Sequence, residues 1–258
     1  MSWFPQIGAG SVAQFPVSRS RRWRAIANRM ESSELILLPD AAGGQIVWKL
    51  SYRDLVDSEV QNLSNLFTAS QGGFGAFTFI DPLANLFGWS EDLSQSAWQV
   101  GLLQTATGVI DPLGTHRASS VTNPNPGAQS IGQSLGVSGD YVACFSVYLR
   151  SNAAGMVALH RDGTTRTVSV GPAWQRVFVS GKGVSGAGQS TFSLTVAPGQ
   201  TIDVWGLQVE AQPYPSPYKQ TSAGLGIYEE TYFGNDELTI TSTSVGFSAC
   251  EITLISRV

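Results

Sequence analysis

The chain has 258 residues, enough for one large or two ordinary domains, and only 13% of them are charged while 28 are glycine. This composition, without long helical periodicity, favours a β-rich protein with many turns. No apolar run reaches the roughly 18 to 20 residues of a membrane-spanning helix. The start MSWFPQIGAG lacks the basic and apolar regions of a signal peptide. We therefore expect synthesis in the cytoplasm and no membrane insertion.

The net charge of −4 comes from the end of the chain. Residues 1–85 carry seven basic and seven acidic side chains, and residues 86–224 again carry seven of each. Residues 225–258 carry five acids and one arginine. A protein that grips nucleic acid concentrates basic residues on one face, so this distribution argues against that class.

The first third of the chain predicts strands and one helix. The strand candidates are RRWRAIAN (21–28), ELILL (34–38), QIVWKLSY (45–52) and the β-formers at 77–80. The helix is expected to take Asp57 as its N-cap and to end at Gly72 and Gly73. Between these signals, apolar residues at helical spacing form one stripe that would face a sheet: Val60, Leu63, Leu66 and Phe67.

Residues 86–224 show short strands at regular spacing, which is the pattern of a β-sandwich. YVACFSVYLR (141–150) alternates between an apolar face and a more polar face that carries Ser146, Tyr148 and Arg150. Further strand candidates are 155–161, 164–170, 174–180, 190–196 and 201–210. Glycine-containing and proline-containing turns separate them.

The segment 211–224 is proline-rich and extended, and Glu210 just before it is expected to tie this exit strap down. The last segment, 225–258, again predicts strands but is too short to bury a core of its own. It therefore needs a sheet to join. We interpret 86–224 as an insertion into a discontinuous domain made of 1–85 with 225–258. The predicted fold class is all-β with one flanking helix.

Two sets of motifs resemble proteins of bacteriophage tails. FPQIGAG…AQFPVSR, WKLSYRDLVDSEVQNLSNLF, GAFTFIDPLANL and the closing DELTIT…GFSACEITLISRV resemble distal tail proteins of tailed phages and gene transfer agents. NLFGWSEDLSQSAW and VWGLQVEAQPYPSPYKQT resemble the borders of jelly rolls like carbohydrate-binding modules. The resemblance implies a tail-tube-like β-sandwich or barrel, with an inserted jelly-roll domain at 86–224.

What the resemblance implies about function is a virion structural protein at the tail tip. Distal tail proteins form a homo-oligomeric ring, usually a hexamer, that joins the tail tube to the tip or baseplate hub proteins. DNA passes through the channel of such a ring as cargo. The acidic end of the chain would line that lumen or, alternatively, sit on a solvated edge strand.

No motif predicts catalysis. The chain has two histidines and contains no HExxH, CxxC, GxSxG or Walker sequence, so we expect no enzyme activity, no metal and no cofactor. Glycosidases need two carboxylates across a cleft. No spacing selects such a pair among the carboxylates of the middle segment, Glu91, Asp92, Asp162, Asp203 and Glu210. The two cysteines are expected to be small buried residues.

A shallow glycan groove is the first candidate site. Sugar sites combine aromatic rings with planar hydrogen-bonding groups. The candidate residues are Ser146, Tyr148 and Arg150, with His160, Arg176 and Gln208 as neighbours. The alternative is that this face packs on neighbouring tail proteins or has lost its binding. Four tryptophans of the segment are expected in the core or at the sandwich edge: Trp89, Trp98, Trp174 and Trp205.

A ring interface is the second candidate. The basic run SRSRRWRAIANR contains Arg19, Arg21, Arg22 and Arg24, and arginine pairs well with carboxylates at interfaces. We expect its partner to be the acidic stretch of a neighbouring copy, with Glu229 and Glu230. The alternatives are contact with DNA and an ordinary solvated strand edge. A dedicated glycan-binding adhesion protein, which need not form rings, remains the alternative function.

Overall fold

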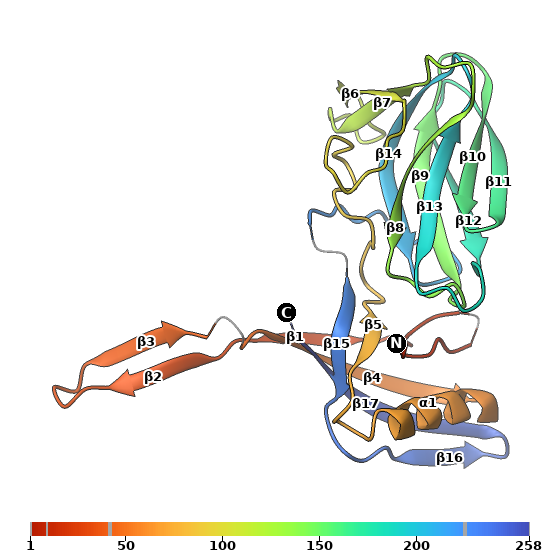
Figure 1. The fold of residues 1–258 in the computed structure, drawn as a ribbon. Coiled ribbons are helices and arrows are strands. Elements are labelled where there is room, and N and C mark those ends of the chain that lie inside the picture. The colour runs from red at the N-terminus through yellow and green to blue at the C-terminus, as the bar shows by residue number, and fades with distance from the viewer. Residues whose placement is uncertain (1, 9, 41–42, 224–225, 258) are drawn as a thin grey trace. The chain divides into compact units, whose positions relative to one another are not determined.

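The computed structural model describes residues 2–8, 10–40, 43–223 and 226–257. These residues form seventeen β-strands and one α-helix, which confirms the prediction of an all-β fold with one helix. The chain divides into two compact units (Figure 1). Unit 1 comprises 1–8, 12–80 and 228–258, and unit 2 comprises 9–11 and 81–227. Among the described residues, no helix is long and apolar enough to cross a membrane.

Unit 1 is built on an antiparallel sheet whose strands come from both ends of the chain. Its order is β1-β4-β17-β15-β5, with β16 added beside β17. The strands are β1 (Ser18–Arg22), β4 (Gln45–Leu55), β5 (Phe77–Ile80), β15 (Ile227–Phe233), β16 (Ile240–Ser244) and β17 (Phe247–Arg257). The two longest, β4 and β17, pair from Gln45 opposite Arg257 to Leu55 opposite Ser248. The C-terminal segment thus obtains its core by joining this sheet.

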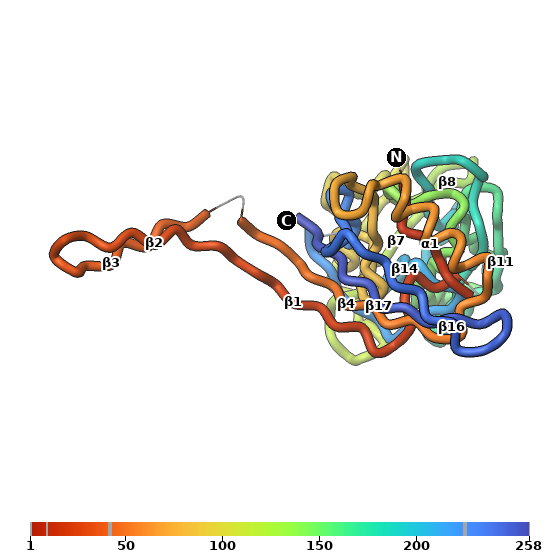
Figure 2. Tube along the Cα trace, turned by 90° about the horizontal axis from the view of Figure 1, so that it is seen from below, coloured from red at the N-terminus to blue at the C-terminus, as the bar shows by residue number. Residues whose placement is uncertain are grey.

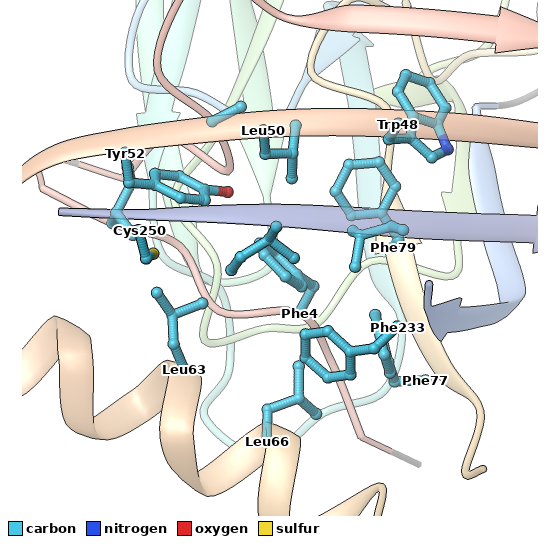
Figure 3. Close-up of a cluster of buried hydrophobic side chains, with 14 of the residues drawn as sticks. Phe4, Trp48, Leu50, Tyr52, Leu63, Leu66, Phe77, Phe79, Phe233 and Cys250 are labelled. Atoms are coloured by element: carbon cyan, nitrogen blue, oxygen red, sulfur yellow. The ribbon is translucent and has the colours of Figure 1, made fainter. Parts of the chain in front are cut away.

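Helix α1 (Asp57–Ala69) covers the apolar face of the sheet (Figure 3). Its buried residues Leu63 and Leu66 join a cluster rich in aromatic rings. The Trp48 and Phe79 ring centroids lie 5.1 Å apart, which is a favourable spacing for tilted rings. This cluster is the core of unit 1.

The start of α1 differs from the prediction by one residue. Val56 occupies the N-cap position, and Asp57 is the first residue of the helix. The reason is that Glu59, at the third helical position, accepts a 2.8 Å hydrogen bond from the Val56 backbone N–H. That carboxylate accepts a hydrogen bond from a backbone N–H that has no partner within the helix. Its negative charge also interacts favourably with the positive N-terminal end of the helix dipole.

Strands β2 (Ala25–Arg29) and β3 (Leu35–Pro39) form a two-stranded ribbon of their own. Figure 2 shows it continuing from β1 and β4, with no other strand beside it. We call residues 25–39 the arm. Every residue of both strands is exposed. The sequence predicted these strands, but not that they would lie outside the sheet.

Unit 2 is a jelly-roll β-sandwich of two antiparallel sheets. One has the order β11-β10-β13-β8 and the other β12-β9-β14-β7-β6. From β8 to β14 the chain repeatedly crosses between the two sheets, which is the connectivity of a jelly roll. The strands are β6 (Gln104–Val109), β7 (Ala118–Thr122), β8 (Gln129–Leu135), β9 (Ala143–Arg150), β10 (Gly155–Arg161), β11 (Thr164–Val170), β12 (Gln175–Gly181), β13 (Ser190–Val196) and β14 (Thr201–Glu210).

The core of the sandwich contains three aromatic rings in mutual contact. Phe87, Phe145 and Phe192 are fully buried, and the Phe87 and Phe145 centroids lie 5.4 Å apart. Strand β9 alternates as predicted, because Phe145, Val147 and Leu149 all point into this core. The intervening side chains therefore lie on the outer face of the five-stranded sheet.

Candidate functional site

The outer face of the five-stranded sheet is organised in rows across its strands. One row places Arg176 of β12 opposite Tyr148 of β9, with Trp205 of β14 on the other side of Tyr148. The next row places Arg150 opposite Asp203. Residues directly opposite in an antiparallel pair share one face and lie within contact distance. The strand pairing therefore gathers aromatic rings and guanidinium groups on one surface.

Arg150 is held by two contacts. Its Nε donates a 2.8 Å hydrogen bond to Asp203 Oδ2, and its guanidinium lies 4.7 Å from the centroid of the Trp174 ring. Both charged side chains remain partly exposed. The Trp174 ring is partly exposed as well. This part of the face thus combines a flat apolar ring with two planar polar groups.

A line of aromatic rings continues beside this pair. The Arg176 guanidinium lies 5.3 Å from the centroid of Tyr148, and the Tyr148 and Trp205 centroids are 5.1 Å apart. Tyr218 continues the line, 4.7 Å from Trp205. Tyr148 and Arg176 are partly exposed, whereas Trp205 is buried beneath its neighbours.

The exit strap covers the part of the face that carries Ser146, Gln208 and Glu210. Gln208 Oε1 accepts a 2.8 Å hydrogen bond from the Lys219 backbone N–H, and Glu210 Oε2 accepts one of 2.9 Å from the Ser216 backbone N–H. The expectation that Glu210 ties the strap down is confirmed by this bond. Ser146 and Gln208 are fully buried as a result.

Arg117 closes the margin of the face next to Trp205. Its Nη1 lies 3.4 Å from Glu91 and donates a 3.1 Å hydrogen bond to Gln220 of the strap. Burial raises the pKa of the Glu91 carboxyl above its usual value, and the positive charge of Arg117 opposes this rise. Burial also raises the pKa of the Cys144 thiol, to about 12, so this thiol stays protonated. Cys144 and Cys250 are both free and buried.

The structure brings together only part of the predicted groove. Tyr148, Arg150 and Arg176 lie side by side with partly exposed side chains. Ser146 and Gln208 share this face but are covered by the strap. His160 does not join them, because it lies on β10 of the opposite sheet, where its Nδ1 is 2.9 Å from Thr165 Oγ1.

Two residues of the face were not among the predicted site residues. Trp174 was expected to pack in the core or at the sandwich edge, yet its ring lies against Arg150. Asp203 was considered only as a possible member of a catalytic carboxylate pair, yet it is the partner of Arg150. The alternation within TIDVWGLQVE places Asp203 on the outer face, so this sequence signal was present.

The predicted ring residues lie on separate strands of unit 1. Arg19, Arg21 and Arg22 are on the edge strand β1, whereas Glu229 and Glu230 are on β15, with β4 and β17 between them. The Arg19 guanidinium lies 5.6 Å from the Trp48 ring centroid. Two of these charged residues are paired within the chain: Arg24 with Asp40, and Glu230 with Arg257 at 3.8 Å. Arg21 and Arg22 have no ion pair within the described part of the chain.

No protein-family model matches the chain, and no curated protein is detectably similar in sequence. Among solved structures, it is similar to the enzymatically active domain of bacteriophage CBA120 tailspike protein 4 (12% identity, TM-score 0.38, 51% of this chain and 22% of that one). It is also similar to the CBM22-1 xylan-binding domain of Paenibacillus barcinonensis Xyn10C (10% identity, TM-score 0.41, covering 51% of this chain and 97% of that one). A third similar structure is the C-terminal family 22 carbohydrate-binding module of Clostridium thermocellum Xyn10B (14% identity, TM-score 0.41, covering 50% of this chain and 96% of that one).

Proposed function

We propose that this chain is a structural protein of a phage-like tail, and that unit 2 binds a polysaccharide on the surface of the host cell. The observation that carries the binding proposal is the uncovered part of the outer sheet face. There the rings of Trp174 and Tyr148 lie beside Arg150, Asp203 and Arg176. Such a surface offers a sugar ring apolar stacking and planar hydrogen-bonding partners at once.

The contacts within this face define how a sugar would bind. The Arg150 guanidinium occupies one face of the Trp174 ring, so a sugar that stacks there displaces it. Arg150 remains tied to Asp203 and can then turn its free N–H groups toward sugar hydroxyls. The strap closes the neighbouring rows of the sheet, so the ligand occupies only the rows of Tyr148 and Arg150.

The binding proposal is tested with the full-length chain on an array of purified bacterial surface polysaccharides. We expect saturable binding to at least one of them and a loss of about tenfold or more in affinity for Trp174→Ala, because a stacked aromatic ring is removed. Phe74→Ala, which removes an exposed aromatic ring of unit 1, is the matched control and should bind normally. Equal binding by Trp174→Ala and the wild type contradicts the proposed site.

The proposal includes no catalytic step. The bound polysaccharide should therefore keep its length during prolonged incubation with the protein, as measured by release of reducing ends. A steady release that depends on the chain contradicts this part of the proposal. In the assembled particle we expect the protein at the tail tip, where a labelled antibody viewed by electron microscopy would locate it.

For unit 1 we propose a homo-oligomeric ring, a hexamer by the resemblance of the sequence, that joins a tail tube to tip or baseplate hub proteins. The supporting observation is that Arg21 and Arg22 occupy the edge strand β1, while Glu229 lies on β15, which β4 and β17 separate from β1 in the same copy. A contact between different surfaces of successive copies brings such opposite charges together and closes into a ring when the rotation allows it.

The ring is tested by mass photometry of the purified chain over a range of concentrations and salt. The double variant Arg21→Glu/Arg22→Glu should fail to assemble, and adding Glu229→Arg should restore assembly, because the charge pairing is then reversed. A wild-type chain that binds polysaccharide but stays monomeric would favour a dedicated adhesion protein instead. Assembly of the double variant at the wild-type concentration contradicts the charge contact.

A further inference from the structure

The ion pairs on the outer face of the five-stranded sheet of unit 2 expose their cations more than their carboxylates. Among the described residues, four pairs lie on this face and along its margin: Arg117 with Glu91, Arg117 with Asp111, Arg150 with Asp203, and Lys219 with Glu210. In each pair the basic side chain is the more exposed partner. The Arg117 side chain is 39% exposed and that of Asp111 is 0% exposed. The face therefore presents its positive groups to solvent and keeps its carboxylates less accessible.

Arg176 differs from these cations because no carboxylate is paired with it. It has no ion pair within the described part of the chain. Its Nη2 donates a 3.0 Å hydrogen bond to Ser146 Oγ, and its guanidinium lies 5.3 Å from the Tyr148 ring centroid. Its Nε is buried and has no hydrogen-bond partner among the described residues. A hydroxyl and an aromatic ring thus hold a partly exposed cation whose charge is left unpaired.

The surroundings of Arg176 favour an anion as its partner. A partly buried guanidinium loses some of its hydration, and an opposite charge compensates for that loss. The planar fork of its N–H groups fits the two oxygens of a carboxylate or a phosphate. Trp174 lies two positions earlier in the chain, about 7 Å away in an extended segment and on the same face. One ligand can therefore contact the Trp174 ring and Arg176 together.

We propose that the polysaccharide bound by this face is acidic, and that a carboxylate or phosphate on it pairs with Arg176 while a sugar ring stacks on Trp174. This inference rests on the proposed polysaccharide binding and names the class of its ligand. Arg150 has a different role, because its charge is already paired with Asp203 and its remaining N–H groups bind hydroxyls. Arg176 thus selects for charge, and Arg150 orients the sugar.

The ligand class is tested with the full-length chain on the array of bacterial surface polysaccharides. The array includes neutral dextran, xanthan and hyaluronan, which carry carboxylates, and a teichoic acid, which carries phosphates. Each carboxylate-bearing polymer that binds is measured again after its carboxyl groups are reduced to alcohols. We expect the affinity to fall by about tenfold or more after reduction, and to fall as sodium chloride is added. Salt-sensitive binding confined to the phosphate-bearing polymer would identify the anion as phosphate.

The role of Arg176 is tested by changing the charge of the face in both directions. Arg176→Gln should lower the affinity for the acidic polymer by about tenfold and leave binding to its reduced form unchanged. Asp203→Asn should strengthen binding to the acidic polymer, because it removes a negative charge while its amide oxygen still accepts from Arg150. Trp174→Ala should weaken binding to both forms. The matched control is Lys182→Gln, which removes an exposed positive charge after the end of β12 and should bind normally.

The possible results distinguish this inference from the proposed function. If only neutral polymers bind, or if reduced polymers bind as tightly as the acidic ones, the inference is wrong and polysaccharide binding stands. Equal affinity of Arg176→Gln and the wild type for the acidic polymer overturns the pairing with Arg176. If no polymer of the array binds, the proposed binding function and this inference are both wrong.

Discussion

The β4–β17 pair and the arm are both antiparallel pairs rich in apolar side chains, yet the chain covers only the first. Along β4, residues such as Trp48, Leu50 and Tyr52 point to one side, where α1 and the aromatic rings of the cluster bury them. Along β2 and β3, apolar side chains point to both sides and remain exposed. Strand pairing satisfies the backbone in both cases, but burial requires a further element on each apolar face.

The largest expected effect is on stability, and it tests this difference between β4 and the arm within unit 1. Trp48 is fully buried, and its Nε1–H donates a 3.1 Å hydrogen bond to Ser256 Oγ on β17. Trp48→Ala should lower the free energy of unfolding by about 3–5 kcal/mol, because it leaves a cavity in the core. Leu37→Ala, on the arm, should change the stability of the dissociated chain by less than about 0.5 kcal/mol. Urea denaturation of both variants measures the difference, and similar losses would contradict the assignment of the arm as uncovered.

An intermediate effect is expected where the exit strap covers the outer face of unit 2. Glu210 is almost fully buried and accepts hydrogen bonds from the Ser216 backbone and hydroxyl. Glu210→Ala should cost about 1–3 kcal/mol, because it leaves the partly buried Ser216 N–H without its acceptor. Hydrogen exchange should then accelerate at the strap amides. Ser222→Ala, at an exposed position nearby, is the control, and unchanged strap protection in Glu210→Ala would show that other contacts hold the strap.

The smallest effect concerns the margin of the same face and depends on pH. Burial raises the pKa of Glu91, so the folded chain disfavours the ionised carboxylate once the pH exceeds that raised value. Glu91→Gln removes this penalty and should therefore raise the melting temperature relative to the wild type at neutral pH. The difference should shrink as the pH falls below the usual carboxyl pKa, where both chains are neutral at this position. A difference that does not vary with pH between 4 and 8 contradicts this account.

Local structure was largely predictable from the sequence. Apolar spacing between Val60 and Phe67 predicted helix α1, and the alternation in YVACFSVYLR predicted which side chains of β9 face the core. These signals are local, because a helix or strand repeats within a few residues. The helix start shifted by one residue because Glu59 caps it from inside, a contact that a search for a capping side chain at the N-cap does not detect.

The candidate site was only partly predictable. Alternation showed that Tyr148 and Arg150 share a face, and strand pairing in the structure added Asp203 and Trp174 to them. His160 was misplaced because alternation identifies the face of a strand but not the sheet that the strand joins. Ser146 and Gln208 were expected in an open groove, and the strap that covers them returns from a distant part of the chain.

By itself, the sequence determined the all-β class, the single helix and the polarity of the two faces of β9, because propensity and periodicity act over neighbouring residues. Only the tertiary structure decided which faces are covered. It buried one apolar face beneath α1, covered part of the outer sheet face with the strap, and left both faces of the arm exposed. Burial is settled by segments far apart in the chain, so equally apolar strands end in a core or at a surface according to what packs against them.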